Sequence, residues 1–317
     1  LMSNENVIKV LHAARQDVEI FYQAGGVIPH PLFDTQIAAM VCGYGEQAGY
    51  ETLVNSICKK SIDKSQRFTD WSKRPLSDRQ LDYALSDVTY LRDVYETLKE
   101  KIEGAGRLSW VNEEMDVLTS PSTYENHPED AWKRLKVKST NQRFLAQVQA
   151  LAKFRETEAQ TLNVPRNRVL DDKSLLQLAA HAPHSDKELR ATAGHAWFLK
   201  DKKLCAKVLQ LVAKTESMPK ENLPKKPPQP NNKRAPEGTM ELLKVLLKHQ
   251  CQAAGVATKL VATVSELESY AKGDNRQAHF LVGWRKVVFG EYAEELMRGN
   301  LAISVSKKGL ELKTVTK

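Results

Sequence analysis

The stretch DKSQRFTDWSKRPLSDRQLDYALSDVTYL, residues 63–91, contains the best-defined element of the chain and decides how the fold is interpreted. Ser77 and Gln80 follow a proline in the pattern of a capping box, in which two side chains satisfy free backbone N–H groups at a helix start. Apolar residues then recur at helical spacing, which predicts a long amphipathic helix ending at Gly104 and Gly106. These apolar residues are Leu81, Ala84, Leu85, Val88, Leu91, Tyr95 and Leu98.

Strand-like and helical patterns alternate over the first segment of the chain, to about residue 115, which is typical of an α/β layer. Residues 7–11 are rich in β-branched side chains and predict a strand. Residues 16–24 predict a helix, which a Gly-Gly pair and a proline end. Two short apolar helices are expected at 35–42 and 50–58.

The rest of the chain is predicted to be helical, with two interruptions. Residues 116–130 are polar and rich in turn formers, so we interpret them as a linker before a wholly helical domain at 131–215. Residues 216–237 are proline-rich and basic, as in a semi-rigid spacer. A second helical block at 238–303 loosely echoes the first, and a tail with some strand character follows at 304–317.

Composition limits the classes of function that need to be considered. A chain of 317 residues exceeds what one hydrophobic core usually supports, so two or three domains are expected. The net charge of +8 favours an anionic partner such as nucleic acid, although a generic basic surface gives the same charge. No apolar run is long enough to cross a membrane, and the N-terminus does not resemble a signal peptide. Four scattered cysteines, Cys42, Cys58, Cys205 and Cys251, indicate a reducing compartment, so we expect a cytoplasmic protein.

Two short motifs carry side chains that can do chemistry. Asp17 ends the segment HAARQD, where the predicted strand meets a helix, and Tyr83 and Asp87 lie one turn apart on the long helix. By themselves these motifs are weak signals. Taken alone, Asp17 favours a surface carboxylate at a helix start over a metal ligand. Taken alone, the other pair favours a half-buried tyrosine beside a solvated aspartate.

Longer matched strings give the motifs a context. HAARQDVEIF, PLFDTQIAA and the stretch at 63–91 resemble, in order and spacing, the ribonuclease D family. FRETEAQTLNVPRNRVLDDKSLLQLA is similar to the helicase-and-RNase-D C-terminal (HRDC) domain, and FLVGWRKVVFGEYAEEL is similar to a divergent second copy. The resemblance implies an α/β ribonuclease-H-like 3′–5′ exonuclease domain at 1–115, N-terminally truncated, followed by two all-α HRDC-type domains.

The resemblance also assigns roles to the motif residues. Asp17 and Asp87 match metal-binding aspartates, and Tyr83 matches a tyrosine that orients or helps to deprotonate the attacking water. The cofactor implied is a divalent metal, Mg²⁺ or Mn²⁺, with two ions in the complete enzyme. The family's first motif, Asp-x-Glu, is absent before Asp17. We therefore expect that upstream residues are missing and that this chain binds metal poorly and cleaves slowly.

Other polar residues are weaker candidates. Lys64, Trp71 and Arg74 are expected either to line an RNA path or to brace a loop against the long helix. Asp34 is expected to be a structural carboxylate near the site. Phosphate contacts in the helical domain are also possible, although a charge cluster is usually a solvated face. The residues concerned are Arg155, Arg166 and Arg168.

The leading hypothesis is a metal-dependent 3′–5′ exoribonuclease that releases nucleoside 5′-monophosphates, with tRNA precursors as the implied substrate for 3′-end maturation. Two alternatives stay open. One is a non-catalytic nucleic-acid-binding protein with an incomplete nuclease domain, and the other is a 3′–5′ DNA exonuclease. We expect no membrane association and no obligate protein partner.

Overall fold

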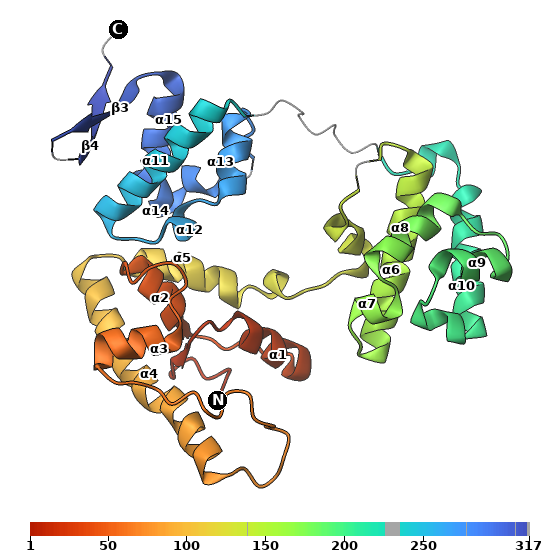
Figure 1. Ribbon diagram of the computed structural model, residues 1–317, viewed down its shortest axis with the longest axis horizontal. Helices are drawn as coiled ribbons and strands as arrows, with labels where there is room; N and C mark the ends of the chain where they lie inside the picture. The colour runs from red at the N-terminus through yellow and green to blue at the C-terminus, as the bar shows by residue number, and fades with distance from the viewer. Residues whose placement is uncertain (138, 226–234, 277, 308, 316–317) are drawn as a thin grey trace. The chain divides into compact units, whose positions relative to one another are not determined.

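The computed structural model describes all residues except 138, 226–234, 277, 308, 316 and 317 (Figure 1). The chain forms two compact units, one from residues 1–124 and 233–317 and the other from residues 125–232. Among the described residues, no helix has the length and apolar character needed to span a lipid bilayer.

A β-α-β arrangement opens the first unit. Strands β1 (Lys9–Leu11) and β2 (Leu32–Asp34) pair in parallel, and helix α1 (Arg15–Gly25) connects them. The predicted strand at 7–11 is thus present over its last three residues. The sequence pattern missed β2, because three consecutive buried residues show no periodicity. Within the described residues the expected α/β layer comprises this single parallel pair, and its carboxyl ends lie side by side.

The short helices of this unit appear where the sequence predicts them. Helix α2 (Thr35–Val41) follows β2 directly, and α3 (Tyr50–Leu53) continues into a π-helical turn over Val54–Cys58. Helix α5 (Leu108–Thr119) extends into the segment expected to be a linker. Its last turn is held by Met115 and Leu118, which are buried in the core of the unit.

The long helix α4 (Asp78–Gly104) confirms the prediction in extent but differs in burial. The capping box between Ser77 and Gln80 is present. In the C-terminal half, Val94, Leu98 and Ile102 are fully buried in the core. In the N-terminal half, the apolar stripe expected from the spacing is exposed instead. Leu81, Leu85 and Val88 are 46%, 59% and 61% exposed.

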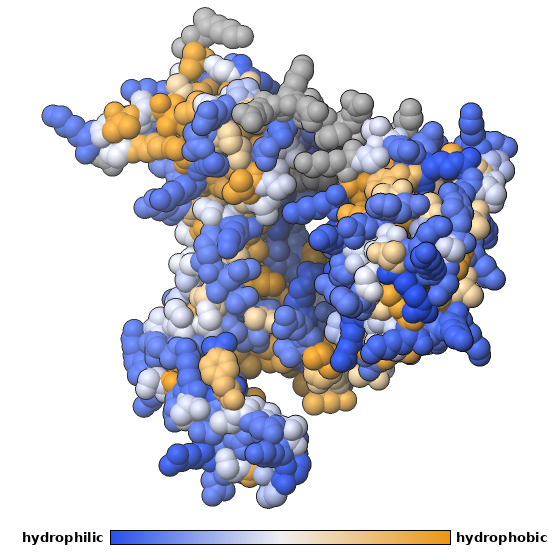
Figure 2. All heavy atoms as spheres, turned by 45° about the vertical axis from the view of Figure 1, so that its right-hand side comes forward, coloured by the Kyte–Doolittle hydropathy of each residue, from blue (hydrophilic) through white to orange (hydrophobic). Residues whose placement is uncertain are grey.

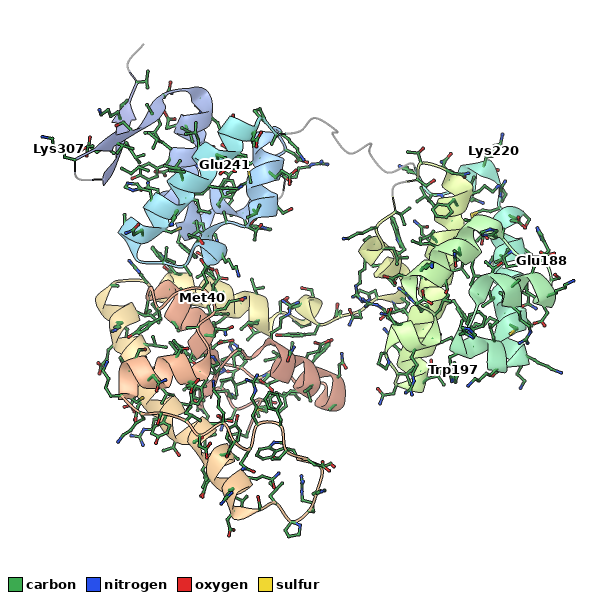
Figure 3. The ribbon with its side chains drawn as sticks, viewed as in Figure 1. Met40, Glu188, Trp197, Lys220, Glu241 and Lys307 are labelled. Atoms are coloured by element: carbon green, nitrogen blue, oxygen red, sulfur yellow. The ribbon has the colours of Figure 1, made fainter. Side chains whose placement is uncertain are left out.

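The C-terminal helical block belongs to the same compact unit as residues 1–124. The rings of Trp110 on α5 and Trp284 stack with centroids 4.4 Å apart and an interplanar angle of 11°. Met40 of α2, labelled in Figure 3, accepts a hydrogen bond through its carbonyl oxygen from the Ala257 N–H at 3.0 Å. Arg285 donates to the Leu260 carbonyl oxygen at 2.7 Å and pairs with Glu114.

The block consists of one long helix, several short helices and a terminal hairpin. The helices are α11 (Glu237–Ala254), α12 (Thr258–Val261), α13 (Val264–Ala271), α14 (Gly283–Arg285) and α15 (Glu291–Arg298). Strands β3 (Leu301–Ser306) and β4 (Gly309–Thr314) form the antiparallel hairpin, so strand structure begins before the predicted tail at 304. The likeness of this block to a second HRDC domain stays a prediction.

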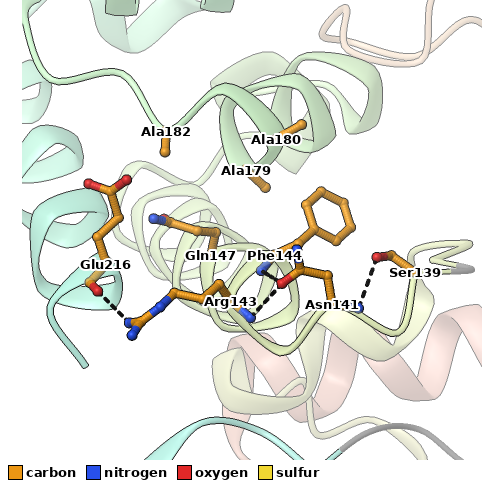
Figure 4. Close-up of a pocket in the computed structure, with 9 residues that line it drawn as sticks. All are labelled: Ser139, Asn141, Arg143, Phe144, Gln147, Ala179, Ala180, Ala182 and Glu216. Carbon is orange, nitrogen blue, oxygen red and sulfur yellow. Dashed lines mark hydrogen bonds between the residues drawn. The ribbon is translucent and has the colours of Figure 1, made fainter. Parts of the chain in front are cut away.

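The second unit is an all-α domain with its own core, which includes Val148, Leu151, Leu175 and Phe198. Its helices are α6 (Gln142–Leu162), α7 (Arg166–Val169), α8 (Asp172–His181), α9 (Asp186–Ala193) and α10 (Lys202–Glu216). Arg143 near the start of α6 donates to the Thr215 and Met218 carbonyl oxygens at 3.0 and 2.8 Å, and also to that of Glu216 (Figure 4). These bonds satisfy carbonyl groups at the end of α10 that the helix itself leaves free.

Candidate active site

Tyr83 and Asp87 lie one turn apart on the exposed half of α4 and open onto a pocket of about 340 Å³. Lys64 lines the same pocket, so the structure brings together three of the residues that the sequence singled out. The other lining residues are Gly49, Tyr50, Glu51, Thr52, Ile62 and Arg67. The pocket therefore combines two carboxylates, two phenols and two basic side chains at the junction between α3, α4 and the loop that connects them.

Tyr50 links this pocket to the end of β1. Its hydroxyl donates to the Ser86 carbonyl oxygen at 3.0 Å, next to Asp87. Its ring lies 5.6 Å from the ring of His12, which directly follows β1. Burial raises the pKa of Tyr50, and the negative charge of Asp87 raises it further, so this phenol stays neutral. Tyr50 thus connects the α4 motif with the turn that leads to Asp17.

Asp34 fixes that turn. It is 2% exposed, and its carboxylate accepts hydrogen bonds from the Ala13 and Ala14 N–H groups at 3.0 and 2.7 Å. It also accepts from Gln36 and Ile37 N–H at the start of α2, at 2.8 and 3.4 Å. Three of these donors bond to Oδ1 and one to Oδ2, so the carboxylate ties the turn after β1 to the start of α2. The expectation that Asp34 is structural is confirmed.

The first turn of α1 carries Asp17, which is exposed. Ala13, with a φ of 55°, makes the left-handed turn between β1 and α1, and the bonds to Asp34 hold it there. Asp17 is not among the described residues that line the α4 pocket. The convergence of Asp17 with Tyr83 and Asp87 around one metal therefore stays a prediction.

Asp87 has the electrostatic character expected of a cation ligand. Asp87 is exposed overall, and the partial burial of its carboxyl group against the pocket raises its pKa. Within the described part of the chain, Asp87 forms no ion pair that would offset this cost. A hard divalent cation prefers carboxylate oxygen and would supply the compensating charge. The described residues contain no cluster of three or more His, Cys, Asp or Glu side chains able to hold a metal.

The loop residues Lys64, Trp71 and Arg74 divide between the two roles expected for them. Lys64 lines the pocket and pairs with Glu51. Trp71 is half-buried, with its ring 5.8 Å from that of Tyr83 and its Nε1 donating to the Gln66 carbonyl oxygen at 3.2 Å. Arg74 donates to two carbonyl oxygens of its own loop, those of Trp71 and Lys73, and so braces the loop.

The arginines of the second unit also divide. Arg155 is 1% exposed, and its Nη1 donates to the Leu170 carbonyl oxygen at 3.1 Å and to Asp172 at 2.6 Å. The expectation that Arg155 contacts phosphate was wrong, because a buried guanidinium bonded to the domain's own atoms cannot reach a nucleic-acid backbone. Arg166 and Arg168 on α7 are exposed, and their contact with phosphate stays a prediction.

Tyr50 and Arg67 are pocket residues of interest that were not singled out from the sequence. Tyr50 gave no signal, because its importance comes from a carbonyl group and a ring that lie far from it in sequence. Arg67 could have been found from the basic character of its loop.

A second pocket of about 420 Å³ lies between α6 and α8 in the other unit, and Figure 4 shows the side chains that line it.

The chain resembles known proteins along nearly its whole length. A family model described as 3′–5′ exonuclease matches residues 1–103, and one described as HRDC domain matches residues 144–199. A ribonuclease D of Jannaschia sp. is 47% identical over 318 residues, which cover 99% of this chain and 81% of that protein. A ribonuclease D of Acidiphilium cryptum is 44% identical over 312 residues, covering 98% of this chain and 80% of that protein.

A solved structure agrees with these relatives. The crystal structure of Escherichia coli RNase D, described as an exoribonuclease involved in structured RNA processing, matches with a TM-score of 0.80. The two chains are 27% identical, and the match covers 94% of this chain and 81% of that one. The expected order of an exonuclease domain followed by an HRDC domain is therefore confirmed. The chain belongs to the ribonuclease D family.

Proposed function

We propose that this chain is a metal-dependent 3′–5′ exoribonuclease that releases nucleoside 5′-monophosphates from the 3′ ends of structured RNA, such as tRNA precursors. The observation that carries the proposal is the α4 pocket, where Asp87 and Tyr83, one turn apart, line the same space as the basic side chains of Lys64 and Arg67. The RNA substrate is proposed from the names of the relatives, each of which is a ribonuclease D.

Asp17 and Asp87 would hold the divalent metal, which when bound activates a water molecule and stabilises the departing 3′ oxygen. Tyr83 lines the same pocket as Asp87, and its hydroxyl would orient the attacking water. Lys64 and Arg67 would place positive charge against the phosphate groups on either side of the scissile bond. Tyr50 would keep the segment around Asp87 in register with the turn after β1 through its bond to Ser86.

We further propose that the 317-residue chain holds the metal weakly. Asp17 and Asp87 supply only part of the three acidic motifs that the family resemblance implies. Mg²⁺ bound by two carboxylates keeps most of its waters and is easily lost. Trimming by this chain should therefore be slow and should need a high metal concentration.

A trimming assay tests the proposal. A 5′-labelled RNA hairpin with a single-stranded 3′ tail is incubated with the chain over a range of Mg²⁺ or Mn²⁺ concentrations. We expect stepwise shortening from the 3′ end, release of 5′-mononucleotides and complete inhibition by EDTA. The variant D87N removes the charge of Asp87 and is assayed beside the wild type. D116N is its matched control, because Asp116 is an exposed aspartate on the neighbouring helix α5.

The same assay separates the two alternatives. Binding of the RNA hairpin without any shortening at saturating metal would favour a non-catalytic nucleic-acid-binding protein. Faster shortening of a DNA strand of matched sequence would favour a DNA exonuclease. Either result would contradict the proposed function.

A further inference from the structure

Phe68 is an aromatic side chain that the fold leaves in solvent. It is 89% exposed, although its neighbours Arg67 and Thr69 take part in defined interactions. The Arg67 guanidinium lies over the Phe68 ring, 5.2 Å from its centroid. Figure 2 shows hydrophilic side chains interspersed with hydrophobic patches on the face in view. Among the aromatic side chains of the described residues Phe68 stands apart, because the other exposed ones, Trp197 and Tyr292, are only 38% and 39% exposed.

The loop that presents Phe68 is internally bonded on both sides of the ring. Before it, the Arg67 N–H donates to the Lys64 carbonyl oxygen at 3.1 Å. After it, the Thr69 hydroxyl donates to the Gln66 carbonyl oxygen at 2.7 Å and accepts from Gln80 Nε2 at 3.1 Å. Gln80 belongs to the capping box of α4, so the loop is anchored to the helix that carries Tyr83. These hydrogen bonds fix the backbone on both sides of Phe68, whose ring is exposed to solvent.

The surroundings of Phe68 are basic and adjoin the α4 pocket. Residues 59–79 contain seven Lys or Arg and three Asp, a net charge of +4. Arg67, which contacts Phe68, and Lys64 both line the pocket with Asp87. An exposed ring with cations beside it is the combination that binds single-stranded nucleic acid, because bases stack on the ring while phosphates meet the cations.

We propose that Phe68 is a stacking platform for one nucleobase of the single-stranded RNA 3′ end, with the adjoining phosphates held by Arg67 and Lys64. This subsite rests on the proposed exoribonuclease function and deepens it. Stacking on Phe68 would bind the RNA strand outside the α4 pocket. Stacking accepts any base, because every base has a π face, so the subsite favours unpaired 3′ ends without selecting a sequence.

The test measures binding of a 5′-fluorescein-labelled single-stranded oligoadenylate RNA by anisotropy, in EDTA to prevent trimming and at fixed salt. F68A should weaken binding about 5- to 150-fold, the range found when one base-stacking aromatic is removed. F68W should restore it. V305A is the matched control, because Val305 is also 89% exposed but lies on the β3 hairpin, and it should bind as the wild type does.

A scan with an abasic residue, placed at each position of the RNA 3′ end in turn, makes the test specific. At the stacked position the wild type should lose affinity and F68A should lose none. R67A should weaken binding to every oligonucleotide alike, because a phosphate contact does not read the base.

Three results would overturn the platform. In the first, F68A binds intact RNA as tightly as the wild type. In the second, an abasic residue lowers the RNA affinity of F68A as much as that of the wild type at every position. Alternatively, F68A could change sedimentation without changing RNA affinity, which would make Phe68 a contact between protein chains. The outcome is separable from that of the proposed function, because binding is measured without metal. Intact trimming by F68A with unchanged binding rejects only the platform, whereas no trimming by the wild type rejects the nuclease.

Discussion

The two halves of α4 have the same sequence pattern and different surroundings. From Val94 onwards the apolar residues are buried among the other helices of the unit. From Leu81 to Val88 they face solvent, and the same turns carry Tyr83 and Asp87. One half of the helix stabilises the fold, and the other half presents Tyr83 and Asp87 at the α4 pocket. Amphipathic spacing does not distinguish a buried half from an exposed one. The spacing shows which residues share one face of the helix, but not whether other parts of the protein cover that face.

The largest effect should come from Asp87. D87N keeps the shape of the side chain but removes the charge that a divalent ion needs. We expect the trimming rate to fall by about 100-fold or more, since losses of this order accompany even the supporting partners of metal ligands. The measurement is the initial rate at saturating Mg²⁺, with D116N run in parallel. If D87N keeps more than half of the wild-type rate, the N-terminal half of α4 does not carry the catalytic function that distinguishes it from the buried half.

Substitutions in the buried C-terminal half of α4 should lower the stability of the fold. Leu98 is fully buried, so L98A leaves a cavity and should destabilise the first unit by about 2–5 kcal/mol. Urea unfolding followed by circular dichroism gives the free energy of unfolding. A cost below about 1 kcal/mol would show that this half packs loosely and would weaken the comparison.

Asp87 should also affect stability, in the opposite sense and with a pH dependence. Its pKa in the fold is raised by burial, so the ionised form is disfavoured in the folded state. The destabilisation is present at neutral pH and disappears as the pH falls below the ordinary aspartate pKa. D87N should therefore raise the melting temperature slightly at pH 7 in the absence of metal, with the gain vanishing near pH 3. A lower melting temperature for D87N at pH 7 would contradict the raised pKa of Asp87 on which this prediction rests.

The smallest effect should come from the exposed stripe. Leu85 is 59% exposed, so L85A removes little buried surface and should change the free energy of unfolding by at most about 0.5 kcal/mol. The same urea series measures it beside L98A. Equal losses for the two variants would mean that the first half of α4 is covered in solution.

Much of the fold could be predicted from the sequence, and the failures have physical causes. The capping box at Ser77 and the helix after it depend on local hydrogen bonds, which short-range pattern reports well. Strand β2 was missed because its three buried residues match no period. Arg155 was misplaced because charge favours exposure in general, whereas here Asp172 and the Leu170 carbonyl group hold the guanidinium inside the domain.

The candidate site was predicted in part for the same reason. Tyr83 and Asp87 are one helical turn apart, so local geometry places them together in the pocket. Tyr50 depends on a contact between distant segments, and no sequence pattern in one chain reports such a contact. The position of Asp17 relative to Asp87 depends in the same way on how the β1–α1 turn meets α4.

The most direct test of the central claim is a double-mutant cycle on metal binding. Mn²⁺ binding to the wild type, D17N, D87N and the double variant is measured by electron paramagnetic resonance of the free ion. If the two carboxylates share a metal, each single variant should lose most of the binding and the double variant should lose little more. If D17N binds Mn²⁺ as the wild type does, or if the two losses simply add, Asp17 and Asp87 do not converge on one ion and the proposed site is wrong.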